Sequence, residues 1–371
     1  MFLLKNSFIS YLLSLVVLSV PAFAALDTFE IDKICKKDVL DAKDLAAIDK
    51  FVAYSIDRML TVEDFSMIGD IRMTIVGRAH STHSSADIQY NPQFSAAMAK
   101  NLSRAFEKIK QMSEPDKKAT LNMNFLILLD NLHDMRLADF SIKMLDNENV
   151  CVRYWAVRSL TNSAALEQFN TSKAPPDLLQ TLLRNFSQSM ASENSPEIIE
   201  QIAQFCAAIN SPEVHNLLFQ IADARIKRYE TCTVDNTAVD GTILKLLAEK
   251  ITPGSDTAGI ARRFGQLYSY TMQLYIKNKN VLGSAKKAEL ASTLALTETR
   301  ALGRLGISQS GIKKALERDN EQAVQSEHDA LFGDGKTAGR LSSVVNIEYV
   351  NPDGSKRTWP AELPACPTQK Q

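Results

Sequence analysis

The feature that most constrains the fold of this chain is a helical repeat pattern over residues 134–160. The first half of the stretch places apolar residues at three- and four-residue steps, so they form one stripe along a helix. A stripe of this kind has to bury itself against a neighbouring helix. Its members are Met135, Ala138, Ile142 and Leu145.

A polar break over residues 146–148 separates this stripe from a second helical pattern. Asn149 is placed to cap the free amides of the second helix. Val152, Ala156 and Leu160 follow at four-residue steps on one face, and the small Ala156 lets two helices approach closely. The two halves together predict a helix-turn-helix hairpin that stacks on similar hairpins.

Helix start signals recur in the middle of the chain. Each places a serine before a proline and an acid, which suits the capping position and the first helical turn. With the apolar runs that follow them, they predict at least six short antiparallel helices between Ala119 and Tyr229, as in an α-solenoid. The signals are Ser113-Glu114-Pro115-Asp116, Ser195-Pro196-Glu197 and Ser211-Pro212-Glu213.

Residues 152–160 read Val-Arg-Tyr-Trp-Ala-Val-Arg-Ser-Leu. This stretch resembles the second helix of HEAT repeats, which often has valine, arginine, two variable residues, alanine, three variable residues and leucine. The family often has acidic residues in the preceding turn, where this chain has Asn147 and Asn149. The resemblance is limited to about residues 134–160, and it implies a solenoid whose concave surface binds another protein.

The predicted fold is all-α: an α-solenoid of antiparallel, HEAT-like helical hairpins, with longer C-terminal helices and a small terminal β-hairpin. After a linker over residues 230–240 we expect longer helices, including one over residues 309–325. Strand propensity over residues 344–350 and a turn at residues 351–354 predict the β-hairpin. The expected parts are a signal peptide (1–24), a helical-repeat region (25–229), a C-terminal helical region (230–340), and the hairpin with its tail (341–371).

The first residues have the pattern of an export signal. Lys5 precedes an apolar run over residues 8–20, and Ala22-Phe23-Ala24 supplies the small residues that signal peptidase needs. We therefore expect cleavage near Ala24 and a periplasmic or secreted protein. The run is short for a membrane span of about 20 residues, so membrane attachment requires the alternative in which the leader stays uncleaved.

Composition narrows the class of partner. The net charge of −1 offers no overall field for nucleic acid, so another envelope or extracellular protein is the expected partner. An odd number of cysteines leaves at least one unpaired. Cys151 and Cys206 lie in apolar helical patterns and are expected to be buried. The candidates for one disulfide, with the pairing left open, are Cys35, Cys232 and Cys366.

Two stretches imitate cofactor sites. Residues 330–337 satisfy a relaxed nucleotide-binding loop, but a charged helical pattern precedes them where that motif needs a strand. We expect these glycines to end a helix and expect no nucleotide. His80 and His83 have no third ligand nearby, so we expect a solvated loop and no metal. No catalytic residue and no cofactor are predicted.

Two groups of aromatic residues are candidates for binding. Tyr154 and Trp155 lie beside Arg153 and Arg158, a combination enriched at protein interfaces, although packing against the next repeat also explains it. The second group has arginines at its start and predicts either core filling or a groove for an extended peptide or glycan. Its members are Phe264, Leu267, Tyr268, Tyr270, Leu274 and Tyr275.

The function predicted from the sequence is a protein-binding scaffold in the bacterial periplasm or cell envelope. The alternative is an exported all-helical enzyme of the hydrolase kind whose catalytic residues come from distant helices. A deep pocket with converging carboxylates or histidines of perturbed pKa would favour the enzyme, and a shallow groove would favour the scaffold. A structural envelope component held by an uncleaved leader is a third possibility.

Overall fold

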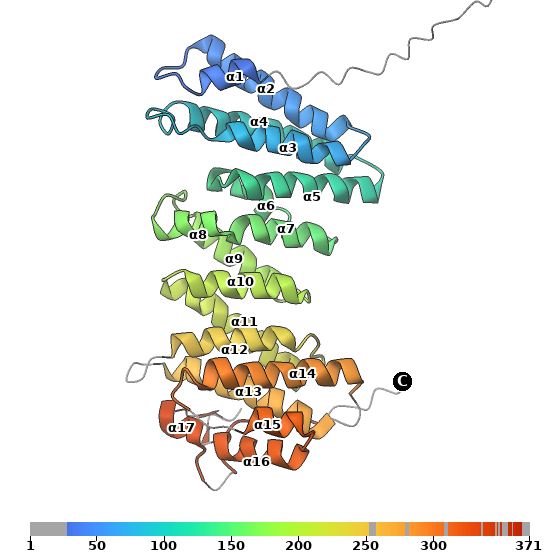
Figure 1. Cartoon of the computed structure of the whole chain (residues 1–371), viewed down its shortest axis with the longest axis vertical. Helices are drawn as coiled ribbons and strands as arrows, with labels where there is room; N and C mark the ends of the chain where they lie inside the picture. Colours follow the sequence, from blue (N-terminus) through green and yellow to red (C-terminus); the bar gives the residue numbers. More distant parts are fainter. Residues whose placement is uncertain are drawn as a thin grey trace, which may run out of the picture.

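The computed structural model describes residues 28–251, 257–278, 282–307, 311–334, 337–345, 347, 349–350, 355–357 and 359–365. These residues are mostly helical, which confirms the all-α prediction. Figure 1 shows the helices stacked along the long axis, from α1 at one end to α17 at the other. The predicted signal segment and its cleavage site lie outside the described residues.

The first half of the stack runs α1 (Phe29–Ile34), α2 (Ala42–Thr61), α3 (Ser66–Ala79), α4 (Tyr90–Lys110), α5 (Pro115–Leu132), the 3-10 turn η1 (Met135–Leu137), α6 (Ala138–Ile142), α7 (Val150–Thr161), α8 (Ser163–Asn170), α9 (Leu178–Met190) and α10 (Pro196–Ala208). The second half runs α11 (Pro212–Glu230), α12 (Ala238–Lys250), α13 (Ala258–Asn278), α14 (Ser284–Thr297), the π-helical turn η2 (Glu298–Leu302), α15 (Ile312–Glu317), α16 (Glu321–Phe332), α17 (Arg340–Val345), β1 (Tyr349–Val350) and β2 (Lys356–Arg357).

Many helices pack on a helix two or three places further along the chain, as well as on the next one. One row follows α5, α7, α10, α12 and α14, and a second follows α9, α11, α13 and α16. The two rows meet through α10 and α11, α12 and α13, and α13 and α14. Most helices of these rows therefore pack against helices before and after them in the chain.

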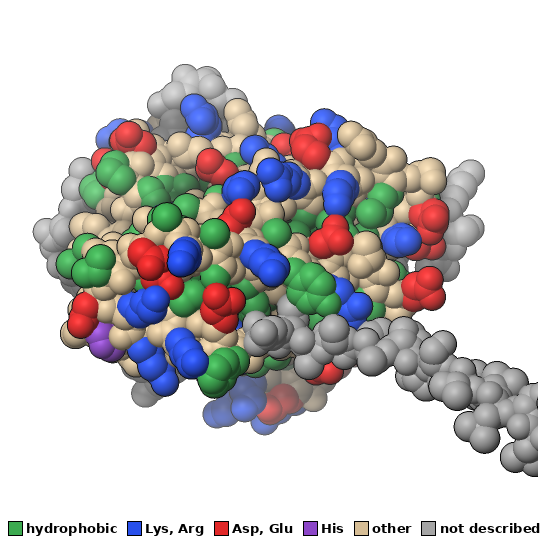
Figure 2. All heavy atoms as spheres, turned by 90° about the horizontal axis from the view of Figure 1, so that it is seen from above, with side chains coloured by type: hydrophobic (Ala, Val, Ile, Leu, Met, Phe, Trp, Pro, Cys, Tyr) green, Lys and Arg blue, Asp and Glu red, His purple; other side chains and the backbone are tan. Residues whose placement is uncertain are grey.

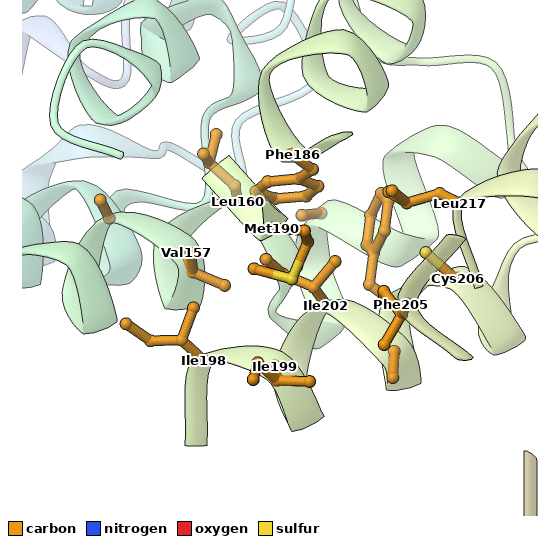
Figure 3. Packing of buried hydrophobic residues seen from close by; sticks show 14 of the residues in the cluster. Val157, Leu160, Phe186, Met190, Ile198, Ile199, Ile202, Phe205, Cys206 and Leu217 are labelled. Atoms are coloured by element: carbon orange, nitrogen blue, oxygen red, sulfur yellow. The ribbon is translucent and has the colours of Figure 1, made fainter. Parts of the chain in front are cut away.

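The core runs through the stack without a break. Figure 3 shows side chains of α7, α9, α10 and α11 meeting in one apolar layer. Ile202 of α10 is fully buried in this layer, which also contains Leu160 of α7 and Phe186 of α9. The rings of Phe186 and Phe205 meet edge to face with centroids 5.9 Å apart. This layer joins the middle of the chain to the helices on either side.

Side-chain caps start several helices where the sequence predicts them. Asn149 accepts hydrogen bonds from the amides of residues 151 and 152, and Ser195 accepts one from Ile198. Two predicted caps are wrong. The Ser211 hydroxyl binds the Glu213 carboxylate, leaving the backbone amides uncapped, and α5 begins after Glu114, one residue later than Ser113 would cap. At both starts the proline in the first turn remains, since it needs no amide partner.

The single helix predicted over residues 309–325 is wrong. The described part of this stretch contains α15 and α16, with a sharp turn between them. Asp319 adopts a left-handed conformation (φ 50°), which ends a helix, and Asn320 caps α16 by accepting the amide of Ala323. Asp319 and Asn320 therefore end one helix and start the next, although the apolar periodicity around them predicts a continuous helix.

The first half of the central hairpin is shorter than its pattern predicts. It forms η1 and the short helix α6, although Met135, Ala138 and Leu145 are buried as expected. The carboxyl end contains the expected antiparallel pair, with Tyr349 opposite Arg357 and residue 350 opposite Lys356. The strand predicted over residues 344–350 is wrong at its start, because residues 344 and 345 belong to helix α17. The predicted turn at residues 351–354 lies outside the described residues.

The cysteines differ in part from expectation. Cys206 is buried as predicted, but Cys151 is exposed, because the first turn of α7 directs it away from the apolar face that contains Val152. Cys232 is disulfide-bonded. Cys35 is a free thiol, so it is not part of a disulfide, and Cys366 lies outside the described residues. Over the described ranges, no helix is both long and apolar enough to cross a membrane.

Replacing Ile202 by alanine tests whether the layer in Figure 3 carries stability. Ile202 is fully buried, so Ile202→Ala should lower the free energy of unfolding by about 2–5 kcal/mol. Met73 is 65% exposed, and Met73→Ala should stay within about 0.5 kcal/mol of the wild type. Urea unfolding followed by circular dichroism measures both values. Equal losses in the two variants would contradict the described packing.

Candidate functional site

Three of the four predicted partner-binding residues lie together on the surface of α7. The rings of Tyr154 and Trp155 meet edge to face with centroids 5.6 Å apart. The guanidinium of Arg158 lies 5.3 Å from the Trp155 ring centre, at cation-π distance. Its Nε is 3.3 Å from a carboxylate oxygen of Asp130 on α5. We call Tyr154, Trp155 and Arg158 the α7 aromatic patch.

The fourth residue, Arg153, binds within the molecule. Its Nε lies 2.7 Å from Oε2 of Glu193, and its Nη2 lies 3.1 Å from Oε1. It also donates to the carbonyl oxygens of Asn147 and Glu148. Burial opposes ionisation of Glu193, but the hydrogen bonds that it accepts from Arg153 and from two backbone amides lower its pKa. Arg153 therefore fastens the start of α7 to the turn before α10.

The α7 aromatic patch is half-buried at its base and open at its rim. Tyr154 and Trp155 pack partly against the core, while the Arg158 side chain is 49% exposed. The sequence predicted that these residues lie near one another, since positions three and four apart share a helix face. It did not predict Asp130, which reaches the patch from 28 residues away. Large rings beside an arginine can bind a protein surface, but they supply no acid, base or nucleophile.

The second predicted aromatic group forms core. All six of its residues on α13 are buried, so core filling is confirmed for them. A different stripe of the same helix contacts an extended segment of the chain itself. Gln266 and Gln273 bind the backbone of residues 361 and 363, and Lys277 binds the carbonyl oxygen of Leu363. We call Gln266, Gln273 and Lys277 the α13 stripe.

Sequence reasoning missed the α13 stripe. The available signal was a pair of glutamines seven residues apart within a helix that is rich in apolar and aromatic residues. Buried amides need hydrogen-bond partners, so such a pair indicates backbone or side-chain groups packed against that face.

A second chain of polar groups joins α13 to α16 and has the residue types of a hydrolase. Ser269 Oγ is 2.8 Å from Nε2 of His328, and Nδ1 of His328 is 3.2 Å from a carboxylate oxygen of Asp329. Ser269 is fully buried in the middle of α13, and its hydroxyl also accepts a hydrogen bond from Gln273. A nucleophile needs a substrate within reach, and the packing around Ser269 leaves it none.

Another buried polar cluster joins α11, α12 and α13. Arg225 donates to both carboxylate oxygens of Asp240, at 2.6 and 3.2 Å, and Tyr229 donates to one of them at 2.8 Å. Burial raises the pKa of Asp240, while the charge and hydrogen bonds of Arg225 act in the opposite direction. Thr271 of α13 lies 3.3 Å from the Tyr229 hydroxyl. Because these groups satisfy one another inside the core, we assign the cluster to stability.

Two cavities in the described part are small or shallow. A space of about 10 Å³ beside His133 and Ser159 has room for one water molecule. A wider hollow of about 210 Å³ lies between α2 and α4, with Ile56 and Leu60 in its lining and the ion pair of Asp57 and Lys108 at its edge. Neither space borders Ser269 or Asp240. Figure 2 shows acidic and basic side chains mixed over the N-terminal end of the stack.

The two imitations of cofactor sites have ordinary structural roles. His80 binds the carbonyl oxygen of Leu132, whereas His83 lies 3.0 Å from the Ser85 hydroxyl. Within the described ranges, no three side chains of the metal-binding types gather at one point. Helix α16 ends at Phe332, and Gly333 follows with φ 93°, so this glycine ends a helix as predicted.

Comparison with known proteins adds no relative: no family model matches the chain, and no curated protein matches it significantly. The reading of the site therefore rests on its geometry.

Removing one member of the buried ion pair should be costly. Arg225→Met leaves the Asp240 carboxylate buried without its charged partner, which should lower the free energy of unfolding by about 3–5 kcal/mol. The double variant Arg225→Met/Asp240→Leu should recover most of that loss, because no unpaired charge remains. Urea titrations of the single and double variants measure the difference. A double variant as unstable as the single one would show that the cost lies in packing.

Stability should also depend on the protonation of His328. Burial lowers the pKa of His328, so on acidification the unfolded chain takes up a proton before the folded chain does. Its contribution is complete above the unfolded pKa of about 6.5 and is lost as the pH falls below that value. His328→Gln should flatten the decrease in melting temperature between pH 7 and 5, while the loop variant His83→Gln should follow the wild type. Identical profiles for all three proteins would rule out this linkage.

Proposed function

We propose that this protein is an exported helical-repeat scaffold that binds another protein in the bacterial periplasm or cell envelope. In this proposal the stacked helices are an α-solenoid of HEAT-like hairpins. The resemblance of residues 152–160 to the family and the packing of many helices on helices two or three places along the chain support that architecture. The export signal pattern of residues 1–24 supports the location.

The α7 aromatic patch is the observation that carries the proposal. Tryptophan, tyrosine and arginine are the residue types most enriched among those that dominate binding energy at interfaces. In the patch they already contact one another, and Asp130 holds the arginine. Side chains held in place before binding lose less conformational freedom when a partner arrives. The patch is thus a preorganised anchor.

The competing proposal is an all-helical hydrolase. It draws support from the order of Ser269, His328 and Asp329 alone. The burial of Ser269 argues against the hydrolase, because an ester or amide substrate could reach this serine only if α13 separated from its neighbours. We therefore place it second.

Affinity capture tests the scaffold with matched variants. The mature chain used as bait on an envelope fraction should recover one protein in stoichiometric amount. Trp155→Ala and Arg158→Ala should each weaken recovery more than tenfold, because loss of a central anchor costs at least about 2 kcal/mol. Tyr54→Ala, at a tyrosine that is 42% exposed on α2, is the control and should recover the partner as the wild type does.

Circular dichroism should first show that the variants are folded. Recovery unchanged by both patch substitutions would move the binding surface elsewhere. Turnover in a hydrolase screen that disappears in Ser269→Ala, with no partner recovered, would favour the enzyme instead.

A further inference from the structure

The segment 359–365, which we call the tail segment, lies along α13 in an extended form. It reads Trp-Pro-Ala-Glu-Leu-Pro-Ala and follows the short strand β2. Its described residues contain no helix or strand of their own. Pro360 and Leu363 are buried, while Trp359 and Glu362 are exposed. The segment therefore directs two apolar side chains inward, packs Ala361 partly against the core and exposes Trp359 and Glu362.

The α13 stripe holds this segment through its main chain. Oε1 of Gln266 accepts the amide of Ala361 at 2.8 Å, and Nε2 of Gln266 lies 3.3 Å from the carbonyl oxygen of the same residue. Both backbone groups of Ala361 are thus bound by one side-chain amide, as two residues bind in an antiparallel sheet. The glutamine takes the place of a neighbouring strand.

The next step along the stripe repeats the pattern. Gln273 lies seven residues after Gln266, on the same helix face. Its Nε2 donates to the carbonyl oxygen of Ala361 at 3.0 Å, and its Oε1 accepts the amide of Leu363 at 2.7 Å. Lys277 completes the row with a 3.0 Å hydrogen bond from Nζ to the carbonyl oxygen of Leu363. The contacted residues are two apart, which is the period of an extended chain.

These contacts recognise the extended backbone of the bound segment more than its side chains. The hydrogen bonds at residues 361 and 363 are made to backbone atoms, so other residues at 361 and 362 would leave them intact. Prolines at 360 and 364 carry no amide hydrogen, and they favour the extended form before binding. Specificity then comes from the two buried positions, Pro360 and Leu363.

Buried polar residues also hold Gln273 of the α13 stripe in position. Gln273 donates to Ser269 at 2.9 Å, and Ser269 is in contact with His328 of α16. This hydrogen bond helps to orient the Gln273 amide, whose oxygen accepts the amide of Leu363. The buried serine and histidine thereby act on binding through Gln273.

We propose that the α13 stripe is a peptide-binding site for an extended, proline-flanked segment of a partner protein, and that the tail segment occupies it within the free chain. The occupant is a peptide with a proline and a leucine three positions apart, matching residues 360 and 363. This inference rests on the proposed scaffold function, because it names the kind of partner segment bound. The tail segment buries few apolar groups, so its release costs less than unfolding of α13.

The test uses the full-length chain in the presence of a reductant, so that no disulfide restricts the tail segment. The probe is a fluorescein-labelled peptide with the sequence of residues 359–365, and fluorescence anisotropy reports its binding. Leu363→Asp in the protein weakens the resident segment and should tighten peptide binding at least tenfold. Gln273→Ala removes two backbone contacts and should weaken binding at least tenfold in the Leu363→Asp background.

Gln204→Ala is the matched control, because Gln204 is an exposed glutamine on α10. It should leave peptide affinity unchanged in the Leu363→Asp background. A peptide methylated on the two amide nitrogens that correspond to Ala361 and Leu363 should fail to bind. A peptide with serine at the positions of Ala361 and Glu362 should bind as the original does.

Hydrogen exchange on the unsubstituted chain supplies an independent reading. Excess unlabelled peptide should remove protection from the amides of Ala361 and Leu363, while α13 keeps its own protection. Absence of peptide binding to the folded Leu363→Asp chain would overturn the proposal. A second result would also overturn it: light scattering shows a dimer that is lost in Gln273→Ala, and the free peptide does not bind. The occupant of the stripe would then be a second copy of this chain. Neither result bears on capture through the α7 aromatic patch, so the two proposals fail separately.

Discussion

Burial of apolar helix faces against two neighbours is the interaction on which the rest of this structure depends. Helix α10 contacts α7 on one side and α12 on the other, and α13 is enclosed by α11, α12 and α16. Most side chains of α13 are buried, so a polar group on its buried faces needs a hydrogen-bond partner inside the protein. The clusters around Asp240 and Ser269, and the α13 stripe, are the result of that requirement.

Because of the same requirement, the buried serine and histidine that resemble a catalytic site have their partners inside the protein, whereas the α7 aromatic patch lies at the surface. The residue types and distances of a hydrolytic site are present in Ser269, His328 and Asp329. Close packing keeps substrate away from them, and Ser269 instead accepts a hydrogen bond from Gln273. Arg225 and Asp240 saturate one another. What remains available to other molecules is surface: an aromatic patch held in position on α7, and a row of amides on α13 that binds extended backbone.

Local sequence signals predicted much of the helical order and failed at identifiable places. Val152, Ala156 and Leu160 are buried on one face of α7, and Asn149 caps that helix as expected. The break at Asp319 was missed because periodicity was weighed above the left-handed tendency of a polar pair. Arg153 was assigned to the surface because its partner, Glu193, lies 40 residues away, beyond the reach of any helix-face argument.

Taken alone, the sequence determined that this protein is helical, which face of most helices is apolar, and where several helices begin. It did so because caps and periodicity act over a few residues. Only the tertiary structure decided which neighbour each face meets, and hence that Gln266 binds Ala361, 95 residues away. The sequence shows that an apolar stripe or a buried amide needs a partner, but the identity of that partner depends on how distant segments pack together.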